Sequence, residues 1–263
     1  MITDPEQETA DFSLVTVTKA ERKHTTAEFR RELVDALGNW ILSRRLRDMV
    51  EQGQAPFQSA GAWKHYMFNA GYMAGVHADG EPQQAEAILA ALARETQRAR
   101  QHGFLAQELE QAVKSTLAAR KQAVETESTR SARGVAGTLN AAAAAGRLPM
   151  SAAQRLKLTK DVIHQITLDQ VNAAFAANFP RDARLVMAVL PADHETGLTE
   201  AGLLEVVAKA EAEKTEKKAA VDEIDRLLPA RPAAGAWTAR EHDDDLDIHS
   251  GTLADGVRAH VRT

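Results

Sequence analysis

The sequence of 263 residues contains no cysteine. Disulfide bonds, thiol nucleophiles and cysteine-ligated zinc or iron–sulfur centres are therefore excluded. A chain without disulfides can function in the cytosol or in the bacterial periplasm, so this absence does not determine the compartment. The N-terminal residues 1–12 (MITDPEQETADF) also lack the basic and apolar regions of a secretory signal. We expect either a cytoplasmic protein or a periplasmic parent protein whose signal lies upstream.

Long apolar runs, an excess of one charge sign and aromatic residues are also scarce. The longest apolar runs fall short of the roughly 18 residues that a membrane-spanning helix needs, which predicts no membrane span. The net charge is -5 and both signs are interspersed, which argues against a nucleic-acid-binding surface. Aromatic residues make up only 5%, but hydrophobic residues reach 44%, so a sizeable core can form.

Residues 25–60 form the most strongly patterned stretch of the chain. Apolar residues recur there at helical spacing; they are Phe29, Leu33, Leu37, Trp40, Ile41 and Met49. Thr25 or Thr26 is a candidate N-cap, and Gly53 followed by Pro56 ends the pattern. We predict a long amphipathic helix over residues 27–52 that leads into a strand.

The remaining patterns predict alternating blocks of strands and helices. The predicted strands are residues 12–18, 57–68, 71–79 and 182–190, and the other predicted helices are 81–102, 105–136, 152–166, 168–179 and 203–212. Hairpin-connected strands interrupted by blocks of helices indicate an α+β fold, with an antiparallel sheet packed against several long helices.

The composition changes after Glu211, where charged residues, prolines and a cluster of acids follow one another. We therefore predict an α+β domain over residues 1–211 and an extended linker over residues 212–248. Residues 249–263 restart a strand-like alternation, which predicts the first strand of a following, truncated domain.

Five stretches, in this order along the chain, resemble the pitrilysin/insulinase-type zinc metallopeptidases, the inverzincins. They are residues 3–6 (TDPE), 40–60 (WILSRRLRDMVEQGQAPFQSA), 103–112 (GFLAQELEQA), 166–172 (ITLDQVN) and 252–258 (TLADGVR). The resemblance covers residues 3–211 and the final dozen residues. It implies the second, non-catalytic α+β domain of one half of such a protease, followed by the linker between the halves.

The resemblance also implies a zinc ion in the parent protein, held by a His-x-x-Glu-His motif. In this sequence no two histidines are four residues apart, so the motif is not present in these residues. We therefore expect no catalytic, cofactor-binding or metal-binding residue in this chain and no peptidase activity from it alone. The implied partners are the catalytic domain and the second half of the same parent chain, together with peptide substrates of the parent.

Several residues are candidates for ligand contacts, but we interpret them as structural. Arg44, Arg45 and Arg47 could contact a peptide or a phosphate, but surface positions along the helix are expected. Tyr66 and Tyr72 could touch a substrate, but the family pattern assigns that role to the other half.

Histidines offer three further candidates. His65 and His77 could face each other across the predicted hairpin, and they are interpreted as ordinary strand residues. His194 beside Glu195 is expected in a loop. Residues 241–249 (EHDDDLDIH) could bind a divalent cation, although an acidic, solvated linker explains the same composition.

Two other functions remain open. The first is a stand-alone α+β module for protein interaction or assembly, without catalytic activity. The second is a carboxylate-based metalloenzyme that uses residues 241–249.

Overall fold

The computed structural model describes residues 1–19, 25–67, 70–144, 146, 148–182, 184–192, 197–220, 230 and 236–262. The chain divides into two compact units, Met1–Ala220 and Val221–Thr263. Each unit has its own β-sheet.

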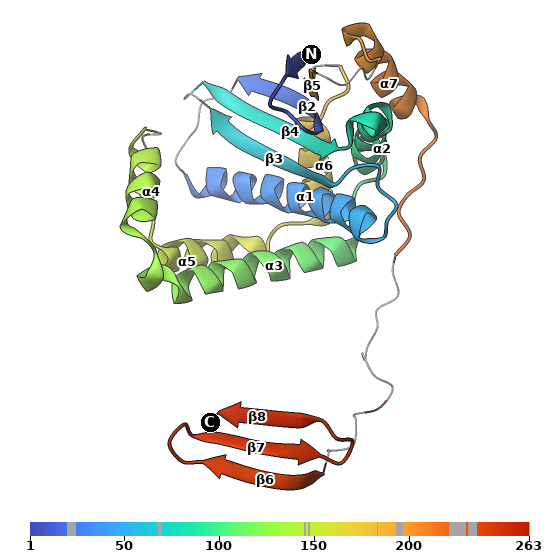
Figure 1. Ribbon diagram of the computed structural model, residues 1–263. Coiled ribbons are helices and arrows are strands. Elements are labelled where there is room, and N and C mark those ends of the chain that lie inside the picture. Colours follow the sequence, from blue (N-terminus) through green and yellow to red (C-terminus); the bar gives the residue numbers. More distant parts are fainter. Residues whose placement is uncertain are drawn as a thin grey trace. The chain divides into compact units, whose positions relative to one another are not determined.

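The first unit is built on a five-stranded sheet with the order β1-β5-β2-β4-β3 (Figure 1). Its strands are β1 (Ile2–Asp4), β2 (Ala10–Lys19), β3 (Ser59–Met67), β4 (Gly71–Gly80) and β5 (Leu185–Pro191). Strands β5, β2, β4 and β3 pair antiparallel, whereas the short β1 adds to β5 in parallel. The predicted α+β fold is confirmed, and the parallel pair makes the sheet mixed.

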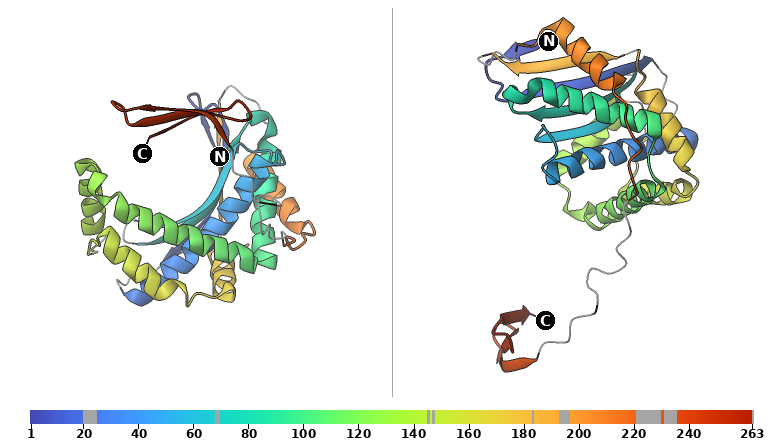
Figure 2. Two further views of the ribbon diagram at one scale, coloured as in Figure 1. Left: turned by 90° about the horizontal axis from the view of Figure 1, so that it is seen from below. Right: turned by 90° about the vertical axis from the view of Figure 1, so that its right-hand side faces the viewer.

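Helices cover one face of this sheet, with α1 and α2 against it (Figures 1 and 2). The helices of the unit are α1 (Thr26–Glu51), α2 (Ala85–His102), α3 (Ala106–Glu125), α4 (Ala132–Ala144), α5 (Ala152–Ile163), α6 (Leu168–Asn178) and α7 (Glu200–Ala212), with two 3-10 turns, η1 (Pro82–Gln84) and η2 (Glu127–Thr129). None of the described helices combines the length and the apolar composition needed to cross a bilayer.

The central strand β2 shows how the two faces of the sheet differ. Phe12 and Leu14 point into the core and are almost completely buried. Val15 and Val17 point to the opposite face, where Val15 is buried but the side chain of Val17 is 61% exposed. The exposed Leu185 and Met187 lie on neighbouring β5, on the same face as Val17.

Helix α1 begins and ends where the sequence predicts. The hydroxyl oxygen of Thr25 accepts a hydrogen bond from the backbone N–H of Glu28 at 3.2 Å, which caps the first turn. Gly53 has a φ of 67°, a conformation that glycine adopts without strain, and the chain turns there towards β3. Leu33, Leu37 and Ile41 form the buried stripe between the sheet and the other helices.

The sequence patterns mispredicted two segments. Residues 2–4 form β1, a strand that the sequence patterns did not predict, because three residues are too few to show alternation. The helix predicted over residues 105–136 stops at Thr126, and α4 starts at Ala132. Small and polar residues around this break weaken helix propensity, and few buried contacts compensate for it.

The second unit is a three-stranded antiparallel sheet with the order β6-β7-β8. Its strands are β6 (Trp237–Asp243), β7 (Ile248–Leu253) and β8 (Arg258–Arg262). The prediction of a linker up to residue 248 is therefore wrong over β6, and the last segment contains two strands rather than one. Residues 237–243 form a strand because they pair with β7. Their acidic composition does not predict a strand, since acidic residues have a low strand propensity. Part of the predicted linker, residues 221–229 and 231–235, lies outside the described residues.

The junction between α2 and α3 is fixed by a buried ion pair with α1. The guanidinium of Arg45, only 4% exposed, donates to both carboxylate oxygens of Glu108, at 2.7 and 2.6 Å. It also donates to the carbonyl of Gly103 at 3.2 Å and lies 5.0 Å from the ring centroid of Phe104. Glu108 in turn accepts from the backbone N–H of Leu105, which caps α3. The prediction that Arg45 is a surface charge is therefore wrong.

Glu108→Ala is expected to lower the free energy of unfolding by about 3–5 kcal/mol, because it leaves the buried guanidinium of Arg45 without its counter-charge. Urea unfolding measures this difference. Glu110→Ala is the matched control on the same helix, since the ion pair of Glu110 with Lys114 is exposed and such pairs contribute about 0.5 kcal/mol or less. Equal effects of the two substitutions would contradict a central role for Arg45.

Candidate functional site

A groove of about 610 Å³ runs between α1 and the edge strand β3. Polar residues of α1 recur at spacings of three and four along this side of the helix; they are Glu28, Glu32, Asp35, Asn39 and Ser43. All but Glu28 line the groove. Aromatic residues of α1, β3 and β4 complete the lining, among them Trp40, Trp63, Tyr66 and Tyr72.

A closed polar network forms one part of this groove. The ammonium of Lys64 donates to Asp35 Oδ2 at 2.8 Å and to Asn178 Oδ1 at 2.8 Å. The amide of Asn178 donates to Asp35 Oδ1 at 2.8 Å, so each of the three side chains contacts the other two. Asp35 is only 8% exposed. A carboxylate buried to this extent needs its cation, so the network holds α1, α6 and β3 together.

Both tyrosines considered from the sequence lie beside this network. The hydroxyl of Tyr72 donates to Glu28 Oε1 at 2.5 Å, and Glu28 also pairs with Arg31. The ring of Tyr72 is 5.0 Å from the Lys64 ammonium and 5.0 Å from the ring of Tyr66. Both tyrosines line the groove, next to a cation and two carboxylates.

The edge of the sheet is partly occupied by α1. The hydroxyl oxygen of Ser43 accepts from the backbone N–H of Ala62 at 2.9 Å. That N–H therefore points away from β4, as alternate backbone groups of an edge strand do. An edge strand with outward-pointing backbone groups can pair with an added extended segment.

Asn39 provides an acceptor in the groove that has no hydrogen-bond partner among the described residues. Its side chain is 7% exposed, and its Oδ1 atom is buried. Buried polar atoms in folded proteins are nearly always paired, so an unpaired one in a groove marks a position where a ligand donor fits.

A second groove, of about 950 Å³, continues past Glu32 towards α4. It is lined by Thr26, Phe29 and small residues of α4 such as Gly137 and Ala141. Figure 2 shows α4 rising beyond the ends of α1 and α5. Of the residues described in α4, only Ala142 is buried.

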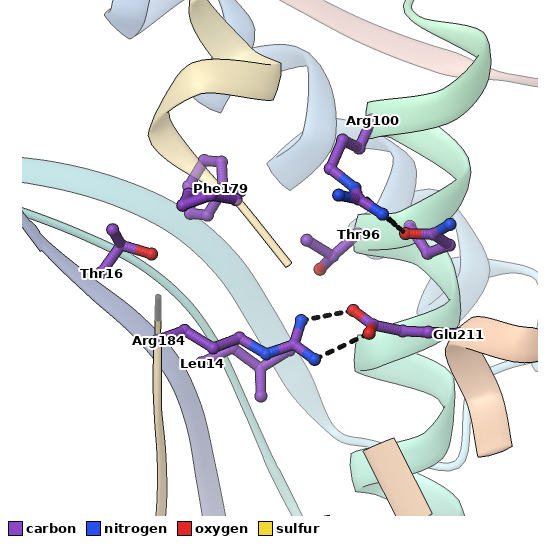
Figure 3. Close-up of a pocket in the computed structure, with 9 residues that line it drawn as sticks. Leu14, Thr16, Thr96, Arg100, Phe179, Arg184 and Glu211 are labelled. Carbon is purple, nitrogen blue, oxygen red and sulfur yellow. Dashed lines mark hydrogen bonds and ion pairs between the residues drawn. The ribbon is translucent and has the colours of Figure 1, made fainter. Parts of the chain in front are cut away.

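Figure 3 shows a much smaller pocket, where α7 and the start of β5 meet. Arg184 forms a bidentate ion pair with Glu211, which is 5% exposed. Leu14 and Phe179 close the space, which measures about 10 Å³. A volume of this size holds at most one water molecule, so this pocket is part of the core and not a binding site.

The other sites considered from the sequence are separated by the fold. Strand register pairs His65 with Met73 and His77 with Gly61, so the two histidines do not face each other across the hairpin. Arg44 and Arg47 are exposed, as expected. His194 and Glu195 lie outside the described residues.

The histidines of the acidic segment are brought together. His242 and His249 are opposite each other in β6 and β7, and Asp247 lies beside them. This cluster belongs to the second unit and is independent of the groove.

Sequence patterns do not reveal the groove network, because its members come from three different elements. Only the polar spacing on α1, from Glu28 to Ser43, could have indicated a polar face next to the apolar stripe.

The fold of this chain is found in solved peptidase structures. The periplasmic protease PqqL from Escherichia coli matches 100% of this chain with a TM-score of 0.76 and 16% identity, and this chain covers 29% of it. The peptidase M16 inactive domain from Pseudomonas fluorescens matches 74% of this chain with a TM-score of 0.52 and 18% identity, over 43% of that chain.

The inactive peptidase domain of a protein named as a zinc protease, from Bordetella parapertussis, matches 70% of this chain. Its TM-score is 0.51 and its identity 20%, and the match covers 93% of that chain. No protein-family model matches the sequence, and no curated protein does. At these identities the likeness shows the fold, and it confirms the resemblance to pitrilysin/insulinase-type peptidases at that level.

Lys64→Met is expected to lower the free energy of unfolding by about 3 kcal/mol, because Asp35 then remains buried without its cation. Adding Asp35→Asn should recover part of this loss, since the uncompensated charge disappears. Chemical denaturation of the two single variants and the double variant measures the coupling.

Lys157→Met is the control for Lys64→Met. Lys157 pairs with Asp161 on the surface, where its side chain is 80% exposed, so a change of about 0.5 kcal/mol or less is expected. Additive effects of the Lys64 and Asp35 substitutions would contradict the network.

Proposed function

We propose that this chain is a non-catalytic α+β domain of a zinc-dependent peptidase of the pitrilysin/insulinase type, and that it forms part of the wall of the peptide chamber. The main support is the likeness in fold, over the full length of this chain, to a periplasmic protease of which the chain spans 29%. The likeness to two inactive peptidase domains supports the non-catalytic role. The parent protein would supply the zinc site, and its location would be periplasmic.

The groove between α1 and β3 supports peptide contact at this wall. An extended peptide presents backbone donors and acceptors together with side chains of alternating direction. The edge strand β3 offers backbone groups and Asn39 an acceptor, while Trp40 and Trp63 offer apolar surfaces. This combination suits an unfolded peptide better than a small rigid molecule, because the polar groups are spread along the groove.

The chain alone is expected to cleave no unstructured peptide, with or without added Zn²⁺. A quenched fluorescent casein or peptide library measures this, with the complete parent protein as the positive control. Chelator-sensitive cleavage by the isolated chain would contradict the non-catalytic assignment.

Peptide contact is tested in the parent protein. Trp63→Ala, at a residue of β3 that lines the groove, is expected to raise KM for an unstructured peptide by about threefold to tenfold with little change in kcat, because it removes binding contacts and leaves the reacting atoms untouched. Leu204→Ala, at an exposed position of α7, is the control.

Two results would refute this proposal. A parent protein without a His-x-x-Glu-His domain would favour the stand-alone interaction module. An unchanged KM for the Trp63→Ala variant of the parent protein would mean that the peptide does not bind in this groove.

A further inference from the structure

Two histidines of the second unit face the same side of a hairpin. His242 in β6 pairs with His249 in β7. Their rings are stacked, with centroids 4.1 Å apart and an angle of 11° between the planes. Directly paired residues of an antiparallel sheet point to the same face, so both imidazoles lie on one surface of the hairpin.

Carboxylates approach both nitrogens of the His242 ring. Asp244 Oδ1 is 2.9 Å from Nδ1, and Asp247 Oδ1 is 3.3 Å from Nε2. Asp247 has a φ of 52°, the left-handed conformation, and it ends the turn between the two strands. A neutral imidazole carries a single N–H, so it can donate to only one of these two carboxylates. The other carboxylate faces a nitrogen lone pair, and a cation bound between the two would stabilise this arrangement.

We propose that His242, Asp247 and His249 bind one divalent transition-metal ion, and that Asp244 orients the His242 ring. In this arrangement Nδ1–H donates to Asp244 and Nε2 is free to coordinate, which is the usual pattern of a metal-ligating histidine with a carboxylate behind it. The candidate ligand atoms of the three residues all lie within 4.8 Å of one another.

The separation of the ligand atoms fits a tetrahedral ion. Ligand atoms about 2.0 Å from a tetrahedral Zn²⁺ are about 3.3 Å apart. His242 Nε2 and Asp247 Oδ1 have this separation. The ring of His249 must turn to bring its nitrogen equally close, a rotamer change that an exposed side chain makes at low cost. Water would complete the coordination, because all three residues are exposed.

The set of two imidazoles and one carboxylate indicates which class of metal ion the site would bind. Imidazole nitrogen suits Zn²⁺ and its first-row neighbours, whereas Mg²⁺ and Ca²⁺ prefer ligand sets made only of oxygen. The surrounding acids, Glu241, Asp243 and Asp245, add negative charge that favours a cation. The ion would join β6 to β7 and hold this hairpin closed. The site is independent of the zinc proposed for the parent peptidase, because it uses only residues of this chain.

Isothermal titration of the tag-free 263-residue chain with Zn²⁺ tests the proposal. One ion per chain is expected to bind, and His242→Ala or His249→Ala should abolish that binding. His260→Ala is the matched control, because His260 pairs with Ser250 and so lies on the opposite face of the same sheet. It should retain the wild-type affinity. Asp244→Asn should weaken binding by about tenfold, since it removes only the orienting carboxylate.

Each alternative has a distinct result. Binding of Ca²⁺ or Mg²⁺ as tight as that of Zn²⁺, and insensitive to the histidine substitutions, would identify a simple acidic cluster and overturn the proposal. Equal losses in His260→Ala and His249→Ala would indicate general unfolding of the hairpin rather than ligand removal, and would also overturn it. Absence of stoichiometric Zn²⁺ binding to the wild-type chain would also overturn the proposal.

Discussion

The buried contact between Arg45 and Glu108 is the constraint on which the first unit depends. It joins the middle of α1 to the start of α3, and its guanidinium also reaches the carbonyl of Gly103. The backbone N–H of Phe104 donates to Asn172 at 2.8 Å, which brings α6 to the same point. A charge buried to this extent tolerates little displacement of its partner, so four helices take fixed positions around one turn of the chain. Once α1 is fixed in this way, the sheet and the remaining helices have a single arrangement in which its apolar stripe is covered.

The groove follows from the same placement of α1. Because the helix lies along the edge of the sheet, its polar side faces the edge strand instead of solvent, and Lys64 of β3 becomes the counter-ion of Asp35. The cost of burying that carboxylate is offset by three mutual hydrogen bonds, and the result is a rigid polar surface rather than a flexible one. A preorganised surface of this kind favours the proposed peptide contact, since it binds a ligand without a cost for its own ordering.

Acidic residues have different surroundings in the two units. In the first unit, carboxylates such as Glu211 are buried and matched by arginine. In the second, the acids stay exposed, and two histidines flank the turn between β6 and β7. There the pairing of β6 with β7 converts a sequence typical of a solvated linker into a set of converging ligand atoms. Spacing along the chain did not reveal this, because His242 and His249 are seven residues apart and meet only across strands.

The sequence by itself determined the local elements and the class of fold. The spacing from Phe29 to Met49, the cap at Thr25 and the stop at Gly53 are local signals, and local energetics were enough to place α1 to within a residue or two. The five ordered stretches also carried the likeness to pitrilysin-type peptidases. Tertiary structure alone decided the rest: that Arg45 is buried, that Lys64 meets Asp35 and that Trp237–Asp243 is a strand. These outcomes depend on contacts between residues far apart in the chain. The sequence alone does not show whether a charged side chain will be surrounded by water or paired with an opposite charge.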